Sequence, residues 1–368
     1  MVVLASAIAA VSVRRLHRDE SYVGITPGEF PPPGQTVERQ RGGSPQAPAQ
    51  ARPLPPDDLG PGLTGVLMDA RADRAEIVAT LVDLAAQGRL TVTERPAPAG
   101  TDLGSDWLFT HPDESEQPAR DPMELPSPED KLIELLFGDE HQVLLSELDL
   151  NKRRELNEVG DVLIAQAEQR NWFHRLTHAA DAALRVAGPA LFLLGAAAIV
   201  MAGQAWLGGG LILAGVVFWV LTQGLPNPPL TADGYTMRVQ ALGFRDYLSS
   251  AEGVGRTADA VADQVRYLPY ALVFGVFDGW RERLVQAAGT STPDGFGWLI
   301  PLAADGRLLA ADGALPRLVS DLTTHMLATR PIAQMPSGAS NAIPREPVPE
   351  GPLINRLYQR RNGTGVPS

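Results

Sequence analysis

Residues 186–232 read VAGPALFLLGAAAIVMAGQAWLGGGLILAGVVFWVLTQGLPNPPLTA, a run of 47 residues without one Asp, Glu, Lys or Arg. The run contains two apolar blocks, 186–202 and 206–221, separated only by the short polar break GQA at 203–205. Long uncharged apolar segments are typical of membrane helices. The pattern therefore predicts a transmembrane helical hairpin over 186–225, and with it a mainly α membrane protein.

The lengths of the two blocks agree with this prediction. A hydrocarbon core about 30 Å thick needs about 20 helical residues, and a few flanking residues would complete each block. Their Val, Leu, Ile and Phe side chains contribute on the order of −2 to −5 kcal/mol per block to insertion. Trp206 and Trp219 lie near the ends of the second block, where indole rings favour the membrane interface. The alternative is a hairpin buried in a large soluble core, although such helices rarely lack charge on every face.

Basic residues predict the orientation of the hairpin. Arg170, Arg175 and Arg185 precede it, Arg238 and Arg245 follow it, and the turn has none. The positive-inside rule then places both flanks in the cytoplasm and the turn outside. The expected location is the bacterial inner (plasma) membrane, as a multi-pass protein with its main domains cytoplasmic.

Small residues inside the hairpin allow close helix packing. Ala198 lies four residues before Ala202, and Gly210 lies four residues before Ala214, which is the spacing of small residues at membrane helix contacts. Glycines 208–210 could suggest a phosphate-binding loop, but no Lys follows them, so this interpretation fails.

Composition narrows the class of protein further. The net charge of −12 opposes broad nucleic-acid binding, and the absence of cysteine excludes disulfides, thiol catalysis and zinc thiolates. Lys131 and Lys152 are the only lysines beside 29 arginines, which we interpret as the codon bias of a GC-rich bacterial genome.

The first 52 residues predict a membrane segment followed by a linker. Residues 1–13 are apolar and are followed at once by Arg14 and Arg15, so they resemble the cytoplasmic end of a transmembrane helix that begins further upstream. A short anchor with its N-terminus outside is the alternative. Residues 14–52 are rich in Pro, Gly, Gln and Arg, which predicts a disordered linker.

A folded cytoplasmic α+β domain is expected over 53–173. Apolar periodicity predicts a helix at 75–86, and strands at 90–93 and 107–109 follow it. Ser127 and Asp130 predict a capped helix over 128–137, and a longer helix is expected at 151–170. Helices followed by a two-stranded hairpin resemble a winged helix. However, residues 53–150 carry 21 acidic and 6 basic side chains, which favours protein contacts over DNA.

Beyond the hairpin, residues 229–286 predict a cytoplasmic helical region with helices at 231–250 and 266–284. The uncharged stretch 267–277 is too short to span a bilayer. We interpret it as a buried core helix, with a helix lying on the membrane surface as the alternative. Residues 287–368 are expected to be a mostly disordered tail with one helix near 315–327.

Four sequence blocks resemble the predicted membrane protein family of the YciQ type: TADG at 231–234, GFRDYL at 243–248, RYLPYALVFGV at 266–276 with Trp280, and ATLVDLAAQGRL at 79–90. The resemblance covers roughly 54–284. It implies a membrane helix, a cytoplasmic region, a helical hairpin and a cytoplasmic end. It also implies an extracytoplasmic β-rich domain before the first helix, which this sequence lacks. The family's domain has no known function, so the resemblance implies no catalytic residues.

The sequence contains only weak candidates for a metal-binding or catalytic site. His174, His178 and Asp181 have the spacing of one helical face and could ligate a metal, but no second cluster supports them. Six side chains, Glu129, Asp130, Glu134, Asp139, Glu140 and His141, could do acid–base work but are more typical of a solvated acidic face. We therefore predict no catalytic, cofactor-binding or metal-binding residues.

These observations predict a membrane-anchored interaction or scaffold module rather than an enzyme. Its expected partners are the lipid bilayer and a protein at the cytoplasmic face, and no cofactor is expected. The alternative is a membrane-tethered regulator with a nucleic-acid-binding winged helix. The sequence does not identify a small-molecule ligand.

Overall fold

The computed structural model is mostly helical with some sheet and divides into two compact units. Unit 1 contains Met1–Ala49, Arg170–Val239 and Gln334–Arg345, and unit 2 contains Gln50–Gln169, Gln240–Ala333 and Glu346–Ser368. At several helical positions only the backbone is described. The described residues are 2–16, 18–42, 50–56, 59–101, 103–111, 127–174, 178–202, 205–222, 228–250, 264–288, 295–303, 308–327 and 333–334.

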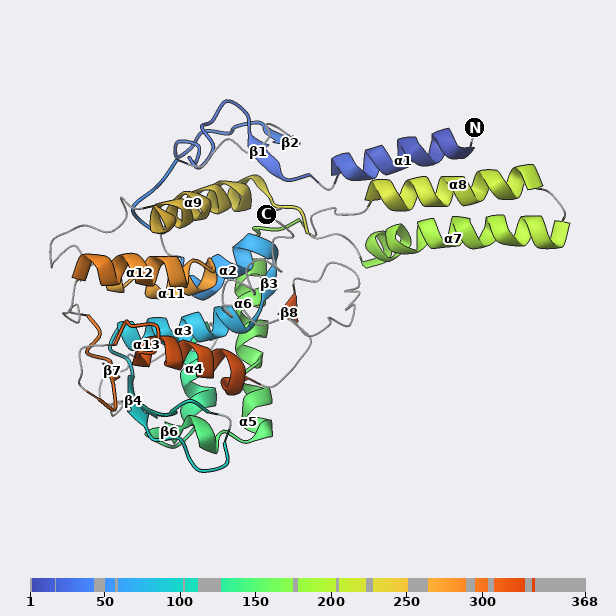
Figure 1. Cartoon of the computed structure of the whole chain (residues 1–368). Coiled ribbons are helices and arrows are strands. Elements are labelled where there is room, and N and C mark those ends of the chain that lie inside the picture. Colours follow the sequence, from blue (N-terminus) through green and yellow to red (C-terminus); the bar gives the residue numbers. More distant parts are fainter. Residues whose placement is uncertain are drawn as a thin grey trace. The chain divides into compact units, whose positions relative to one another are not determined.

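Unit 1 is built on three apolar helices. These are α1 (Val2–Leu16), α7 (His178–Ala202) and α8 (Ala205–Thr222). Helix α8 packs against both of the others, and Figure 1 shows α1, α8 and α7 running side by side. The predicted pair of helices in the uncharged run is thus present, and α1 adds a third helix to it.

A small β-hairpin follows α1 in unit 1. Strands β1 (Glu20–Tyr22) and β2 (Arg39–Arg41) pair antiparallel, with Ser21 opposite Gln40. The prediction of a disordered linker over 14–52 is therefore wrong for 18–42. Composition alone missed the long-range partners that order this segment, such as the backbone hydrogen bond from Glu20 to Leu230. Residues 43–49 lie outside the described part of the chain.

Unit 2 combines helices with a four-stranded sheet of order β6-β5-β4-β7. Strand β4 (Thr91–Arg95) pairs antiparallel with β5 (Asp106–Thr110) and parallel with β7 (Leu299–Ile300), and β6 (Gln142–Leu144) pairs antiparallel with β5. Two further short strands, β3 (Arg71–Ala72) and β8 (Ala333–Gln334), form a separate pair. The helical elements are α2 (Pro61–Asp69), α3 (Arg74–Ala86), α4 (Pro128–Phe137), the 3₁₀ turn Leu145–Glu147, α5 (Leu150–Glu155), α6 (Glu158–Gln169), the later turns of α9 (Ala232–Ser249), α11 (Leu268–Val273), α12 (Phe277–Ala288), α13 (Ala314–Asp321) and the π turn Leu322–Met326.

Local sequence signals account for several of these elements. The predicted helix 75–86 is α3, which is buried along most of its length. The Ser127 hydroxyl accepts a hydrogen bond from the backbone N–H of Asp130 at 3.0 Å, so the predicted cap of α4 is confirmed. The predicted strands at 90–93 and 107–109 form the antiparallel pair β4–β5.

Two expected long helices are broken in the structure. The region 151–170 divides into α5 and α6 at Leu156 and Asn157, where Leu156 is fully buried. The region 266–284 divides at Gly275, which has φ +66°. Gly275 N–H donates to Leu272 O, and the next N–H donates to Ala271 O, which is a Schellman stop for α11. Gly275 is thus a helix-terminating residue rather than part of one helix.

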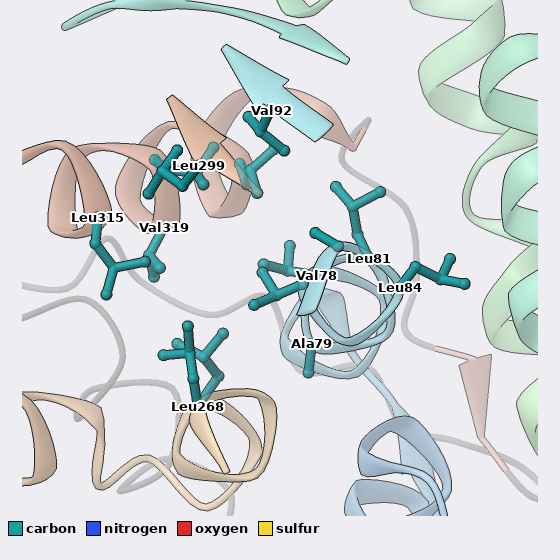
Figure 2. Packing of buried hydrophobic residues seen from close by; sticks show 14 of the residues in the cluster. Val78, Ala79, Leu81, Leu84, Val92, Leu268, Leu299, Leu315 and Val319 are labelled. Carbon is teal, nitrogen blue, oxygen red and sulfur yellow. The ribbon is translucent and has the colours of Figure 1, made fainter. Parts of the chain in front are cut away.

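The prediction of a mostly disordered tail over 287–368 is wrong for 295–303 and 308–327. Figure 2 shows Leu315 and Val319 of α13 directed toward the same core as Val78 of α3 and Leu268 of α11. Strand β7 adds Leu299 beside Val92 of β4. The Gly-, Pro- and Ala-rich composition of these residues does not predict their fold, because their order depends on packing against distant parts of unit 2.

The winged-helix interpretation matches only one part of unit 2. A helix followed by an antiparallel strand pair is present in α3, β4 and β5. These strands do not form an isolated wing, because β6 and β7 extend the sheet on both sides. The stretch 267–277 is buried in the unit 2 core, so its interpretation as a core segment is confirmed.

Candidate membrane-facing bundle and its polar collar

Glycines set the close contact between α7 and α8. A Cβ atom on Gly195 would lie 2.6 Å from the carbonyl oxygen of Gly208, and one on Gly215 would lie 2.8 Å from that of Gly188. The glycines of each helix are seven residues apart, two turns along the same face. This spacing brings the two backbones together at two levels of the bundle, as small residues do in membrane helix pairs.

Of the small residues expected from the sequence to make this contact, Gly210 does not take part in it, and the side chain of Ala202 lies outside the described part of the chain. A Cβ atom on Gly210 would meet nothing within 4 Å. Its predicted companion Ala214 is buried, and its carbonyl accepts a hydrogen bond from the Ser6 hydroxyl of α1 at 2.7 Å. The seven-residue repeat of Gly188 and Gly195 was the signal in the sequence that could have located the contact.

The outer surface of the bundle is apolar. Trp206 is 95% exposed and Val200 is 84% exposed, whereas Ser6, Ala10, Ala214 and Phe218 are buried. Large exposed apolar side chains occur on all three helices, and in a water-soluble bundle such positions are normally polar. They are Leu4, Ile8 and Val11 on α1, Phe192, Leu193, Leu194, Ile199 and Val200 on α7, and Trp206, Leu207, Leu213, Val216, Trp219 and Val220 on α8.

Backbone hydrogen bonds join the chain segments at one end of the bundle. Segment 18–22 follows α1, segment 171–174 precedes α7, and segment 229–233 follows α8. Leu230 O accepts from Glu20 N at 2.9 Å, and Pro229 O accepts from His174 N at 2.8 Å. The C-termini of α1 and α8 and the N-terminus of α7 therefore share this end. We call these segments, together with 39–42, the polar collar.

Ion pairs occupy most charged groups of the collar. Arg41 Nε lies 2.9 Å from Glu20 Oε1, and Arg39 lies 3.8 Å from Asp233. Asp19 accepts a hydrogen bond from Leu230 N at 2.8 Å and lies 4.0 Å from Arg238. These contacts fix the hairpin β1–β2 to the segment that leaves α8.

Two pKa shifts reflect this environment. Burial alone would raise the pKa of Glu20, but the hydrogen bond and charge of Arg41, together with His174, outweigh burial and leave that pKa below its ordinary value. Burial raises the pKa of Tyr22, and its hydrogen bond to Asp233 raises it further. Glu20 therefore stays ionised, and the Tyr22 hydroxyl stays a donor.

The predicted metal candidates do not come together as a described site. His174 Nε2 lies 3.0 Å from Glu20 Oε1, so this imidazole is part of the collar. The side chains of His178 and Asp181 lie outside the described residues. Within the described ranges, no group of three or more His, Asp or Glu side chains could hold a metal ion.

The acidic candidates on α4 form structural contacts in unit 2. Asp130 pairs with Arg89 at 3.0 Å, and Glu134 pairs with Lys131 at 3.1 Å on an exposed face. Burial raises the pKa of Asp83, and the negative charge of Glu129 raises it further, to about 7. The sequence analysis missed Asp83, because its burial depends on the packing around α3.

Glu94 and Asp321 are buried carboxylates that hold the C-terminal segment of unit 2 in place. Glu94 Oε1 accepts from Ser105 Oγ at 2.6 Å and from Arg317 at 2.7 Å, and Glu94 Oε2 accepts from Leu302 N at 3.0 Å. Asp321 Oδ2 accepts from Trp107 Nε1 at 2.8 Å. The oxygens of both carboxylates thus accept hydrogen bonds that are part of the packing of unit 2.

The three helices thus form a bundle with close glycine contacts between α7 and α8 and with large apolar side chains on its exterior. Within the described part of the chain, no helix combines the length and apolar character needed to cross a bilayer. The family model for the predicted membrane protein (DUF2207) C-terminal domain matches residues 49–284, and the chain belongs to this family. No curated protein and no solved structure matches the chain.

Proposed function

We propose that the chain is a multi-pass protein of the bacterial inner membrane that carries unit 2 as a non-catalytic interaction module at the cytoplasmic face. The observation that carries the proposal is the apolar exterior of α1, α7 and α8. Lipid solvates such a surface at no cost, whereas water does not. The family's description as a predicted membrane protein supports the same placement.

Fractionation of cells tests the membrane part of the proposal. We expect the chain to sediment with membranes after lysis and ultracentrifugation, and to stay there in alkaline carbonate, which removes proteins held only by charge. Recovery in the aqueous fraction without detergent would contradict the proposal.

Cysteine labelling tests the orientation, because the chain has no cysteine of its own. Gln204→Cys in the turn should react with a membrane-impermeant maleimide added to whole cells. Ser146→Cys and Ser249→Cys should react only after the membrane is opened. The arginines that flank the hairpin motivate this expectation. The reverse labelling pattern would place unit 2 outside the cytoplasm.

The acidic composition of unit 2 supports a protein partner with a basic surface. Residues 53–150 have an excess of acidic side chains, and the buried carboxylates described above serve packing contacts. Affinity purification in mild detergent at low and high salt tests this part. We expect a partner whose retention falls as the salt concentration rises. Recovery of the chain alone under several growth conditions would count against an interaction module.

The membrane-tethered nucleic-acid regulator stays the alternative, motivated by the order of α3, β4 and β5. In such a fold, the helix before the strand pair would have to enter the DNA groove. Nine of the residues in α3 are buried, on more than one face, which opposes this role. Gel shifts with the detergent-solubilised chain at low salt decide between the two, and sequence-dependent binding would favour the regulator.

A further inference from the structure

An exposed stripe runs along α1 and ends in a positive charge. Leu4, Ile8 and Val11 are 60%, 59% and 44% exposed, and Arg15 is exposed as well. Their spacing of four, three and four residues places all of them on one face of the helix. From Leu4 to Arg15 the helix rises about 16 Å, close to the thickness of one leaflet in a hydrocarbon core about 30 Å thick.

Arg18 lies one turn beyond Arg15 and is held by the hairpin. The N–H of Arg18 donates to the carbonyl of Arg15 at 3.4 Å, so the two arginines follow each other in one turn. A Cβ atom on Gly42 would lie 2.6 Å from Cδ and 3.1 Å from Nη1 of Arg18, so the Arg18 side chain lies against Gly42, the residue that follows β2. This contact limits the directions available to its guanidinium.

The two arginines differ from their neighbours in the collar. Arg39, Arg41 and Arg238 each lie within 4.0 Å of a carboxylate. Among the described residues, neither Arg15 nor Arg18 forms an ion pair. Within the described part of the chain, therefore, these two guanidinium groups at the end of an apolar stripe form no ion pair with a carboxylate.

We propose that Arg15 and Arg18 bind the phosphate of an anionic phospholipid whose acyl chain lies along Leu4, Ile8 and Val11. The inference rests on the proposed membrane function. A guanidinium is suited to a phosphodiester because its N–H groups donate in a fixed planar fork. A lipid whose phosphate has no amine beside it offers a net negative charge, and phosphatidylglycerol has this chemistry. The continuity of stripe and charge selects a lipid rather than a free phosphate ion.

Reconstitution of the full chain into vesicles tests the proposal. The chain is placed in phosphatidylcholine vesicles with and without one-fifth phosphatidylglycerol, and its heat-unfolding midpoint is measured by tryptophan fluorescence. Native mass spectrometry then counts the lipids that stay bound. We expect phosphatidylglycerol to raise the midpoint and to be retained in preference to phosphatidylcholine, whereas inorganic phosphate should have no such effect.

The double variant Arg15→Gln/Arg18→Gln should lose this preference. A basic residue near an anionic membrane surface contributes about 1 kcal/mol, a factor of about five, so the pair should account for about 25-fold. The matched control Arg95→Gln/Arg154→Gln removes two exposed positive charges from unit 2 and should keep the preference. If both variants have the wild-type unfolding midpoint in pure phosphatidylcholine, the substitutions have not changed the folding of the chain.

The outcomes separate this inference from the membrane proposal. If the wild-type chain inserts but shows no preference for phosphatidylglycerol, or if the double variant keeps that preference, the lipid site is refuted and the membrane function stands. If the chain inserts into neither vesicle, both proposals fail together.

Discussion

Gly195 approaches the backbone of α8 so closely that a methyl group does not fit. Its Cβ atom would lie 2.6 Å from Gly208 O and 2.8 Å from the backbone nitrogen of Ile212. Because both contacts are to backbone atoms, a rotamer change cannot relieve them. The glycine is therefore required by helix packing rather than by backbone conformation.

We predict that Gly195→Ala destabilises the bundle by about 1 to 3 kcal/mol, the range for overpacking a closely packed contact. The measurement is the midpoint of SDS-induced unfolding in mixed micelles, followed by tryptophan fluorescence. Gly209→Ala is the matched control, because its Cβ atom would meet nothing within 4 Å and Ala favours helix. Equal midpoints for the two variants would contradict the packing contact.

Asp83 gives unit 2 a pH-dependent stability. Burial, with a smaller contribution from Glu129, raises its pKa from an ordinary value of 3.8 to about 7. At pH values between about 4 and 7, the folded chain therefore keeps a proton on Asp83 that the unfolded chain has released. The stabilisation is complete below about pH 4 and is lost as the pH rises to about 7.

We predict that Asp83→Asn removes this part of the pH dependence and makes unit 2 more stable at pH 8. The Asn side-chain oxygen can still accept the hydrogen bond that Gln87 donates to Asp83 at 2.8 Å. Heat-unfolding midpoints of the full chain between pH 4 and pH 8 provide the measurement. The exposed control Glu134→Gln should keep the wild-type slope, and an unchanged slope in Asp83→Asn would refute the assignment.

At the scale of elements, residues 295–303 and 308–327 complete the sheet and core of unit 2. They lie beyond the residues matched by the family model, yet β7 pairs with β4 and α13 buries Leu315 and Leu318. Glu94 is the main polar anchor, because its side chain is 2% exposed and accepts hydrogen bonds from Arg317.

We predict that Arg317→Gln costs about 2 kcal/mol of unfolding free energy. Loss of the guanidinium leaves the Glu94 carboxylate buried with fewer donors, although Arg317 is partly exposed and water reduces the penalty. Chemical denaturation of the full chain measures the effect. The control Lys131→Gln removes an exposed helix pair worth about 0.3 to 0.5 kcal/mol. If both variants cost the same, Glu94 is not an anchor.

At the scale of the whole molecule, the family-matched region should not be sufficient for a stable unit 2. A chain ending after Ala288 loses β7 and α13, and with them the partner of the β4 edge and many core residues. We predict rapid cleavage of this chain by trypsin within unit 2. A chain ending after Gln334 keeps every described element and should resist cleavage like the full chain. Equal resistance would show that the segment is dispensable.

The sequence determined the apolar helices and several local elements without any tertiary information. The 47-residue uncharged run gives α7 and α8, because a lack of charge is a property of the segment itself. The helix cap at Ser127 and the strand pair β4–β5 also depend on neighbouring residues. For the same reason, the apolar exterior of the bundle could be expected from composition.

Only the tertiary structure decided which groups meet. Glu94 and Arg317 are 223 residues apart, and Ser6 and Ala214 are 208 residues apart. No local pattern encodes such contacts, so the Gly-rich and Pro-rich composition of 18–42, 295–303 and 308–327 does not predict that these segments are ordered. The same holds for Arg15 and Arg18. Only the folded collar showed that the described carboxylates near them pair with other arginines.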